Sequence, residues 1–485
     1  MKVPKGNAMK SQASKSKSTT RKGAKAKQSL SSKLQERKDA DKSPSAEVVS
    51  KSCAVMVQKK VGNQSILHYL YKSTLGQSLH TQLRQCLQEP FIRSLSSYHL
   101  HGADSPFDRR ITSLEWHPTH PSTLAVGSKG GDIYLWNFED TARKSFIRGS
   151  GAGDSIGGMK FCPTDLSKVY VASGGGTVSL QSFEGLPSTV LLGIHDCGHE
   201  HHNVCMWYCC LDLSVSRQML ATGDNMGNLF LLSMDGVKIF GEKLHKAKVT
   251  HAEFNPRCDW LMATSSVDHT VKLWDLRNIK DKTSFLYNLT HEKAVNAAYF
   301  NPVDCSKLLT TDQYNQIRIY TSSDWSKPQH VILHPHRQFQ HLTPIKATWH
   351  PTYDLIIAGC YPDERVCHGN LRTIDIYDSN SAELVYQLYD PSVPGIKSVN
   401  KFSPMGDVIG SGMGSTVLVW DRNESVISDR HKQTGESSAY VTSLRGQRRT
   451  QPRSRDRAPP VDKKLMKTLL SLEEGQTKTK SKKSI

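Results

Sequence analysis

The sequence predicts an all-β fold, a seven-bladed β-propeller, and three observations lead to this prediction. Short β-branched segments repeat from about residue 110, an aromatic-x-Pro mark returns among them at near-constant spacing, and a Trp ends several of the units. Repeats of about 40–45 residues that hold four strands each are typical of propeller blades. Blades arranged radially close into a ring, which leaves only short and protected sheet edges.

The first unit shows the pattern that the others repeat. Strands are expected over residues 111–118, 124–127 and 133–137, with a tight polar turn at 130–132. From the proline of one aromatic-x-Pro mark to the proline of the next, three steps are 45, 46 and 49 residues long (118 to 163, 256 to 302 and 302 to 351). Each step fits one blade with short insertions. The mark itself stands at Trp116-His117-Pro118, Phe161-Cys162-Pro163, Phe254-Asn255-Pro256, Phe300-Asn301-Pro302, Trp349-His350-Pro351 and Phe402-Ser403-Pro404.

One more unit is expected around Leu211-Asp212-Leu213, which fills the gap between the second and third marks without a proline. Trp136, Trp274 and Trp420 each follow an apolar residue and precede Asn or Asp, and repeated Trp-Asp pairs are typical of WD repeats. The count therefore predicts a seven-bladed WD-repeat propeller over residues 101–425.

The charge of the chain is concentrated in its two ends. The formal net charge is +18, of which residues 1–60 supply +12 and residues 430–485 supply +10, so residues 61–429 carry −4. Both ends are rich in Lys, Arg and Ser and poor in aromatic residues, and such segments cannot bury enough apolar surface to offset chain entropy. We expect disordered basic tails over 1–60 and 426–485.

Several classes of protein are not expected. No apolar stretch follows the first residues, so no signal peptide is predicted, and no run approaches the ~18 apolar residues of a membrane span. The 11 cysteines include no CxxC pair, which favours a reducing compartment. Basic clusters in both tails favour the nucleus, although a solvated tail of a cytosolic protein is the alternative.

A helical hairpin is predicted between the first tail and the propeller, over residues 61–100. Apolar residues with helical spacing fill two segments on either side of Gly76, and Pro90 is expected to end the second helix. The hairpin could pack on its own propeller, or it could insert into the groove of a partner. The apolar residues concerned are Ile66, Leu67, Leu70 and Tyr71 in the first segment and Leu79, Leu83 and Leu87 in the second.

The sequence predicts neither catalysis nor a cofactor. The glycine-rich segment 149–153 lacks the spacing and the Lys-Ser/Thr ending of a phosphate-binding loop, and no Gly-x-Ser-x-Gly elbow is present. One cluster holds zinc-ligand residue types, but its spacing fits no closed zinc motif, so a polar loop between blades is expected instead. The cluster is His195, Cys197, His199, His201, His202 and Cys205.

Two long loops are expected on the same face of the ring. In a propeller, the loop between the second and third strands of a blade lies beside the loop that enters that blade. Segment 322–343, with Phe339 between polar and cationic neighbours, should therefore adjoin segment 360–371, which carries Tyr361 and precedes Arg372. The same face should receive Lys129, Trp207 and Lys248. Cations there could bind phosphates, and an exposed aromatic could enter a base stack as a wedge.

Long strings of residues in this chain resemble a known family. The run from His334 to Lys346, with Phe339-Gln340-His341 at its centre, is similar to the corresponding run in the smaller subunits of the UV-damaged-DNA-binding complex, the xeroderma pigmentosum group E proteins. The resemblance extends from about residue 64 to 422. Its other strings are Phe107-Asp108-Arg109-Arg110, Trp116–Thr123 with both prolines, Gly127–Asp132 and Lys248-Val249-Thr250-His251.

The resemblance implies a role for particular residues in binding damaged DNA. Phe339, Gln340 and His341 would enter the minor groove and fill the space left by an extruded photodimer. Trp207 and Tyr361 would form the pocket that receives the flipped nucleotides. The family's backbone contacts would correspond to Arg109, Arg110, Lys129, Lys248, Arg337 and Arg372.

The resemblance also implies a protein partner. The helical hairpin, together with Trp274, Asp275 and Arg277, would dock on a large three-propeller adaptor that connects the protein to a cullin-4 RING ubiquitin ligase. Read from its residues alone, Arg277 is an exposed cation at the rim, with no structural role evident. The alternative function is a WD-repeat scaffold that binds histones or other proteins without touching DNA, which the −4 charge of residues 61–429 would suit.

Overall fold

The computed structural model describes residues 70, 71, 74, 75, 80–140, 142–193, 206–339, 341–366, 369 and 371–422. The two predicted tails lie outside these residues, as do Ile66, Leu67, Leu79 and Gln340. No helix within the described ranges is both long enough and apolar enough to cross a membrane.

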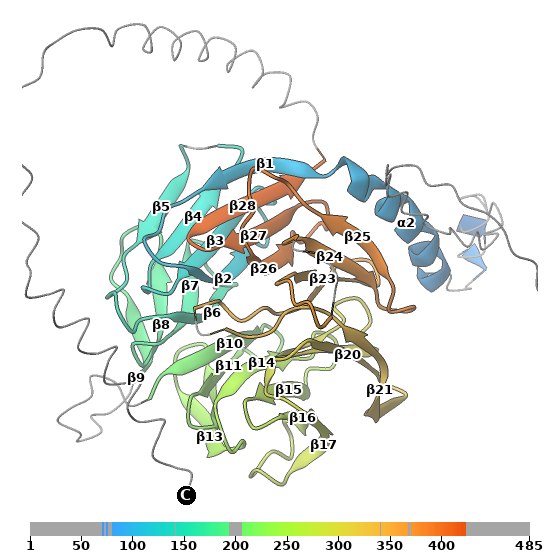
Figure 1. Ribbon diagram of the computed structural model, residues 1–485. Coiled ribbons are helices and arrows are strands. Elements are labelled where there is room, and N and C mark those ends of the chain that lie inside the picture. Colours follow the sequence, from blue (N-terminus) through green and yellow to red (C-terminus); the bar gives the residue numbers. More distant parts are fainter. Residues whose placement is uncertain are drawn as a thin grey trace, which may run out of the picture. The chain divides into compact units, whose positions relative to one another are not determined.

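The described part of the chain forms seven four-stranded antiparallel sheets arranged as a ring, which confirms the predicted propeller (Figure 1). The first blade consists of β2 (Ile111–Trp116), β3 (Thr123–Ser128), β4 (Ile133–Asn137) and β5 (Lys144–Ile147). The second consists of β6 (Ile156–Phe161), β7 (Lys168–Ser173), β8 (Thr177–Ser182) and β9 (Thr189–Gly193). The third consists of β10 (Tyr208–Ser214), β11 (Met219–Asp224), β12 (Asn228–Ser233) and β13 (Lys238–Lys243).

The next three blades follow the same order from the inner to the outer strand. They are β14 (Val249–Phe254), β15 (Leu261–Ser266), β16 (Thr270–Asp275) and β17 (Phe285–Thr290); β18 (Val295–Phe300), β19 (Lys307–Asp312), β20 (Gln316–Thr321) and β21 (Asp324–Leu333); and β22 (Thr348–Trp349), β23 (Leu355–Gly359), β24 (Ile374–Asp378) and β25 (Leu384–Leu388).

The two ends of the folded ring meet in the seventh blade. Its inner strands are β26 (Lys397–Phe402), β27 (Ile409–Met413) and β28 (Thr416–Asp421), and its outer strand is β1 (His99–Asp104) from the other end of the ring. His99 pairs with Asp421 and Asp104 with Val417, so β1 and β28 lie side by side in Figure 1. This pairing closes the ring, and it starts the propeller two residues before the predicted boundary at residue 101.

The predicted Trp marks build the core of the blades. Trp274 and Trp420 are 0% exposed. Trp274 Nε1 donates to Thr264 Oγ1 at 2.8 Å, and Trp420 Nε1 donates to Ser411 Oγ at 3.2 Å. Each indole therefore fills the space between strands while its polar atom is satisfied, which is how a buried Trp avoids a desolvation penalty.

The helix α2 (His80–Ser94) precedes the ring and continues through η1 (Leu95–Ser97) into β1. The prediction that Pro90 ends the helix is wrong, because α2 runs four residues beyond it. Proline removes one hydrogen bond from a helix interior. Burial of Phe91 against His350 and Phe402, with ring centroids 4.7 and 6.3 Å away, stabilises the last turn in spite of this loss.

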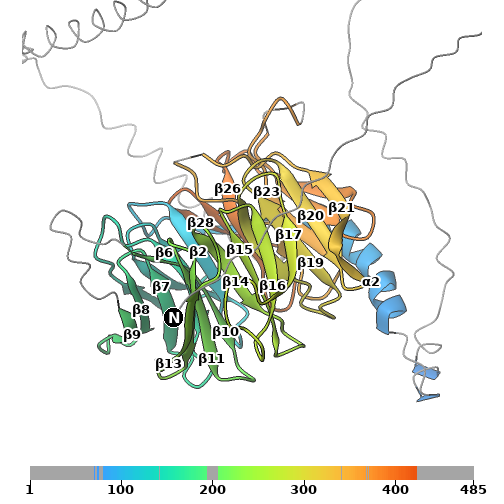
Figure 2. The same ribbon diagram turned by 90° about the horizontal axis from the view of Figure 1, so that it is seen from below.

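Ion pairs fix the same helix on the propeller. Buried Arg84 donates to Asp354 at 2.9 Å and to Asp304 at 3.3 Å, and Gln88 donates to Asp378 at 3.2 Å. These three aspartates lie in the turns β22–β23, β18–β19 and β24–β25. One side of α2 therefore packs on its own propeller, at the edge of the ring seen in Figure 2.

Candidate nucleic-acid interface

Strand order divides the loops of the ring between two faces. The aspartates that hold α2 lie in loops that leave the first and third strands of their blades. The loops β21–β22 and β23–β24 leave the fourth and second strands, so both lie on the opposite face. The predicted shared face is confirmed, and its exposed residues are separated from α2 by the height of the ring.

Two buried histidines anchor the loop β21–β22 at its beginning. His334 and His336 are 0% exposed and their Nδ1 atoms lie 2.9 Å apart. His334 Nε2 lies 3.3 Å from Asp375, and the backbone N–H of His336 donates to Asn315 at 3.1 Å. Burial lowers the pKa of His334 below its usual value, which keeps this pair from carrying two charges. The loop therefore starts from a fixed base.

The tip of this loop rests on the neighbouring loop β23–β24. Phe339 is 41% exposed, and its ring centroid lies 4.7 Å from that of Tyr361. The N–H of Tyr361 donates to the carbonyl of Pro335 at 2.8 Å. Arg337 lies 5.2 Å above the ring of Tyr314 and 5.7 Å from that of Phe339. The aromatic tip is thus supported from one side and open on the other.

The end of the loop crosses the mouth of the central channel. Thr343 Oγ1 donates to the carbonyl of Ile111 in the first blade at 2.6 Å. Gln338 Nε2 donates to the carbonyls of Phe339 and Leu342, which closes a turn around the tip. His341 is exposed beside this turn, and Gln340 lies outside the described residues. The two termini of the segment are therefore held on opposite sides of the channel.

A cavity of about 260 Å³ lies at the foot of this loop. It is bordered by cationic and amide side chains, which makes it suited to a polar anionic ligand. The polar side chains of its wall include Arg110, Lys248, Asn296, Gln313, Gln338 and Lys346.

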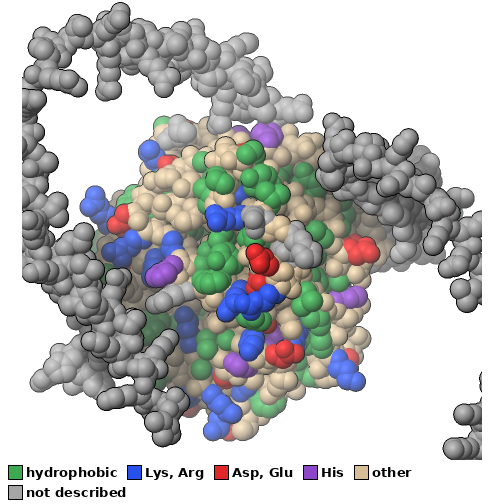
Figure 3. All heavy atoms as spheres, viewed as in Figure 1, with side chains coloured by type: hydrophobic (Ala, Val, Ile, Leu, Met, Phe, Trp, Pro, Cys, Tyr) green, Lys and Arg blue, Asp and Glu red, His purple; other side chains and the backbone are tan. Residues whose placement is uncertain are grey.

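The remaining predicted phosphate contacts lie on this face but do not line the cavity. Lys129 is exposed next to Arg110, whose carbonyl accepts its N–H at 2.8 Å. Arg109 lies 3.9 Å from Asp108 in an exposed ion pair, and Arg372 is exposed in the loop β23–β24. Figure 3 shows Lys and Arg side chains among hydrophobic ones over the view of Figure 1. The loops thus bring cations from several blades to one face.

Trp207 and Tyr361, which the resemblance assigns to one pocket, lie on this face in different blades. Trp207 precedes β10 in the third blade and is 39% exposed, and its backbone N–H donates to Asn225 Oδ1 at 3.0 Å. Tyr361 belongs to the sixth blade. The structure therefore brings Tyr361 to Phe339 and leaves Trp207 across the channel mouth, so a ligand between them would span the ring.

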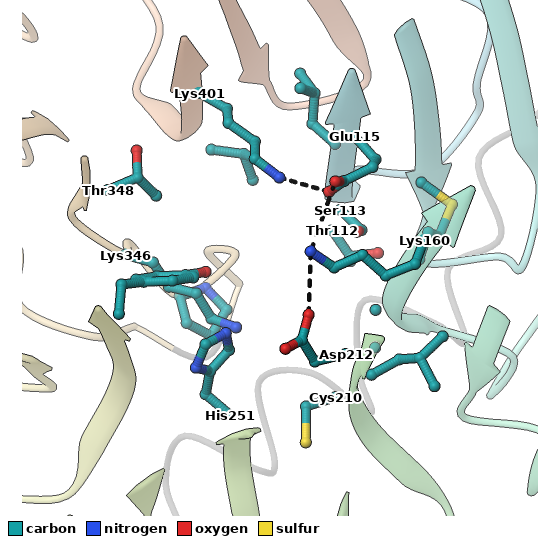
Figure 4. Close-up of a pocket in the computed structure, with 18 of the residues that line it drawn as sticks. Thr112, Ser113, Glu115, Lys160, Cys210, Asp212, His251, Lys346, Thr348 and Lys401 are labelled. Carbon is teal, nitrogen blue, oxygen red and sulfur yellow. Dashed lines mark hydrogen bonds and ion pairs between the residues drawn. The ribbon is translucent and has the colours of Figure 1, made fainter. Parts of the chain in front are cut away.

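The channel below the mouth is electrically self-compensated. Lys160 lies 3.2 Å from Asp212 and 3.6 Å from Glu115, and Lys401 also binds Glu115 (Figure 4). Burial opposes ionisation of Glu115, but Lys160 and Lys401 lower its pKa. Burial and the nearby Asp212 raise the pKa of Glu253 well above its usual value. Attraction for phosphate must therefore come from the mouth of the channel.

Two of the residues assigned to adaptor binding are structural. Trp274 is 0% exposed, so its assignment as a contact residue is wrong. Asp275 is 6% exposed and holds Arg277 through two bonds, of 2.9 and 2.8 Å. Arg277 also lies 4.3 Å above the ring of Trp260. Its exposed guanidinium remains able to meet a partner, and the sequence missed its structural role.

The helical docking residues divide into two groups. Leu87 is 48% exposed on α2, whereas Leu83 is half-buried. Leu70 and Tyr71 are 58% and 64% exposed. One side of α2 therefore packs on the propeller, as in the first alternative above, and Leu87 remains available to a partner, as in the second.

Within the described residues, no group of three or more His, Cys, Asp or Glu side chains is arranged to hold a metal ion. The His and Cys cluster at 195–205 lies outside those residues. Tyr314, Asn296 and Lys346 also contribute to the loop or its cavity, and the sequence did not predict a role for them. Lys346 belongs to the string that carries the resemblance, but nothing in its neighbours along the chain reveals its enclosed position.

Comparison with known proteins agrees with the propeller fold. The WD domain, G-beta repeat, matches residues 94–137 and 238–275. The solved WD40 β-propeller domain of Doa1 aligns with a TM-score of 0.51 and 15% identity, covering 68% of this chain and 98% of that one, which supports the fold alone.

Curated relatives match over most of the chain. DNA damage-binding protein 2 of Danio rerio is 61% identical over 422 residues, 86% of this chain and 84% of that protein. The protein of the same name in Gallus gallus is 58% identical over 431 residues, 87% and 83% of the two chains. Protein DAMAGED DNA-BINDING 2 of Arabidopsis thaliana is 33% identical over 321 residues, 64% and 57% of the two chains. The chain belongs to the DNA damage-binding protein 2 family.

Proposed function

We propose that this protein recognises UV-damaged duplex DNA with the face that carries Phe339. The observation that carries the proposal is the supported but exposed ring of Phe339, next to Tyr361 and beside a cation-lined cavity. In this mechanism Phe339, Gln340 and His341 enter the minor groove, fill the space of a photodimer and displace it from the stack. Separating a base step costs a few kcal/mol, and the cost is least where the bases are damaged.

The cations around the cavity would bind the DNA backbone. Because residues 61–429 carry a net charge of −4, affinity depends on the placed side chains rather than on overall charge. Phosphate contacts position the duplex without reading its sequence. Selection of the lesion then rests on how easily the duplex deforms around the wedge.

The protein would act without catalytic turnover, in the nucleus, as the substrate receptor of a cullin-4 RING ubiquitin ligase that supports nucleotide excision repair. Leu87 on α2 and Arg277 would contact the three-propeller adaptor, and both are exposed. They lie on the face opposite Phe339, so adaptor and DNA could bind together. Nucleosomal histones would be a further partner.

Fluorescence anisotropy with a photodimer-bearing duplex and its intact counterpart tests the proposal. We expect tighter binding of the damaged duplex at the same salt concentration, because salt alone changes affinity strongly. The alternative, a scaffold that binds histones or other proteins without DNA, is favoured by the −4 net charge. Absence of binding to both duplexes would support the scaffold and overturn the lesion sensor.

A further inference from the structure

Lys346 occupies an unusual position at the foot of the Phe339 loop. It lines the cavity of about 260 Å³ at the channel mouth, and it also lines a smaller cavity of about 100 Å³ within the channel (Figure 4). Its side chain is half-buried, so it is reachable from the cavity. Lys346 thus stands where a group inserted below the loop would arrive.

The amine of Lys346 differs from the other enclosed lysines in having no acceptor. Lys160 is paired with Asp212 at 3.2 Å, and Lys397 donates to the carbonyls of Val393 and Arg372 at 2.6 and 3.1 Å. Among the described residues, Lys346 makes neither a hydrogen bond nor an ion pair. No structural contact therefore accounts for this amine.

The surroundings of Lys346 favour its neutral form. Burial is the main cause that lowers the pKa of Lys346 to about 8; Cys210 and Cys209 act in the opposite direction, and the positive charge of Lys248 acts in the same direction as burial. A neutral lysine amine is a nucleophile toward carbonyl carbon, and desolvation beside another cation is a known way to activate it. Much of the amine is unprotonated at slightly alkaline pH.

The same cavity contains hydrogen-bond acceptors that lack donors. Asn296 is 1% exposed, and its Nδ2 donates to the carbonyls of Asp312 and Ile345. Its Oδ1, like Oε1 of Gln338, is buried without a hydrogen-bond partner in the described structure. Buried polar atoms without partners are rare, and these two could accept hydrogens from a donor group that enters the cavity.

We propose that Lys346 forms an imine with the aldehyde of an abasic deoxyribose in DNA held on this face. This inference rests on the proposed function, because the wedge must first bring the damaged nucleotide to the cavity. A site without a base is inexpensive to extrude, since it has lost its stacking and pairing. Lys248 would hold an adjacent phosphate, and Asn296 or Gln338 would accept from the single C4′ hydroxyl that is freed when the sugar ring opens.

The reaction needs no oxidant or reductant. The lone pair of neutral Nζ attacks C1′ of the open-chain sugar, and proton transfer from nitrogen to oxygen gives a carbinolamine. The C1′–O bond then breaks, a second N–H proton is lost, and the oxygen leaves as water while the C=N bond forms. The step is reversible and leaves both DNA strands intact, so it prolongs binding without turnover.

Borohydride trapping of the full-length protein tests the inference. Protein is mixed with a duplex that contains one abasic site, sodium cyanoborohydride reduces any imine, and a denaturing gel measures the covalent product. Lys346→Arg should lower the trapped fraction by about tenfold or more, because it retains charge but not nucleophilicity. Lys144→Arg, an exposed lysine at the start of the outer strand β5 that the proposal does not use, is the control and should retain trapping.

Two further measurements distinguish the absence of an imine from the absence of damage binding. Peptide mapping of the wild-type product should place the adduct on Lys346, so the result does not depend on how a variant folds. Anisotropy with a tetrahydrofuran-containing duplex, which has no aldehyde, measures damage binding alone. Binding of that duplex without trapping, or an adduct on Lys248 or a tail lysine, overturns the imine and leaves the lesion sensor standing. Loss of binding to all damaged duplexes overturns both.

Discussion

The ring of Phe339 leans on the ring of Tyr361, with centroids 4.7 Å apart and planes inclined by 55°. Two loops that enter and cross the sixth blade supply these residues, and the backbone bond from Tyr361 to Pro335 holds the loops together. An exposed aromatic usually pays entropy when it is ordered by a ligand. Here the support is already present in the structure without a ligand.

Replacing Phe339 and His341 together by Ala should reduce preference for damaged DNA more than affinity for intact DNA. The wedge acts only where the stack opens, whereas cations bind any duplex. Anisotropy titrations on photodimer-bearing and intact duplexes give both affinities. Phe146→Ala is the matched control, because Phe146 is 43% exposed on the outer strand β5. Equal losses of affinity for both duplexes would contradict the role of these residues as a wedge.

Lys248→Glu should weaken binding to damaged and intact duplexes alike. The side chain lines the mouth cavity, and loss of one phosphate contact should reduce the salt slope of log K by about 1. Titrations at several salt concentrations measure this slope. Lys144→Glu, at the start of β5 on the opposite face, should leave it unchanged. An unaltered slope in the Lys248 variant would exclude a phosphate contact at that position.

The ring and its faces could be predicted from sequence because both depend on counting repeats. Once seven blades are counted, strand order alone decides which loops share a face, and Phe339 and Tyr361 follow from it. The course of α2 could not be predicted, because the burial that carries it past Pro90 comes from residues such as His350 and Phe402, far away in the chain.

In the functional site, too, the contacts that residues make in the folded chain could not be predicted. Exposed residues at blade rims are visible in the repeat, but the repeat does not reveal which of them are already engaged. Trp274 was assigned to a partner although it is part of the core, and the bonds between Asp275 and Arg277 were missed. The low pKa of Lys346 arises from enclosure by several blades, and no local pattern encodes such enclosure.

Arg84→Ala should destabilise the protein by about 2 kcal/mol, because buried Asp354 loses its charge-assisted hydrogen bond at 2.9 Å and keeps Lys307 at 3.5 Å as its cationic partner. Arg84 is buried, and Asp354 beside it is 3% exposed. Urea unfolding followed by Trp fluorescence measures the change in unfolding free energy. Arg93→Ala on the same helix is the control, since the Arg93 side chain is 71% exposed and its loss should be nearly neutral. Similar effects of the two substitutions would contradict a structural role for the Arg84 pair.

Stability should fall as pH decreases from about 6.5 towards 4. Burial lowers the pKa of His350 to about 4, from 6.5 when unfolded. Its Nδ1 accepts the N–H groups of Thr352 and Tyr353, both at 3.0 Å, so a proton there would break both bonds. A lowered histidine pKa stabilises the fold above the unfolded value, and this contribution, about 3 kcal/mol, is lost as pH falls.

Urea unfolding at several pH values between 7.5 and 4.5 measures this dependence. His350→Gln should make the pH profile shallower without removing its slope, because this imidazole is lost while buried His251, His291 and His334, whose pKa values are also lowered, remain. Exposed His341→Gln should leave the profile as it is in the wild-type protein. A wild-type profile without slope between pH 6.5 and 4.5 would contradict the prediction.

Leu87→Arg should weaken binding of the three-propeller adaptor without unfolding the protein. Leu87 is 48% exposed on α2, while Arg84, Gln88 and Phe91 on the same helix are engaged with the propeller. An apolar anchor that becomes desolvated in a partner groove contributes about 2 kcal/mol or more, so an affinity loss of roughly 30-fold is expected.

Biolayer interferometry with the purified adaptor measures this loss of affinity. Val190→Arg, 58% exposed on β9 in the second blade, is the matched control and should retain adaptor binding. Because α2 and Phe339 lie on opposite faces, the Leu87 variant should bind damaged DNA as the wild type does. Unchanged adaptor affinity would show that this side of α2 faces solvent in the complex.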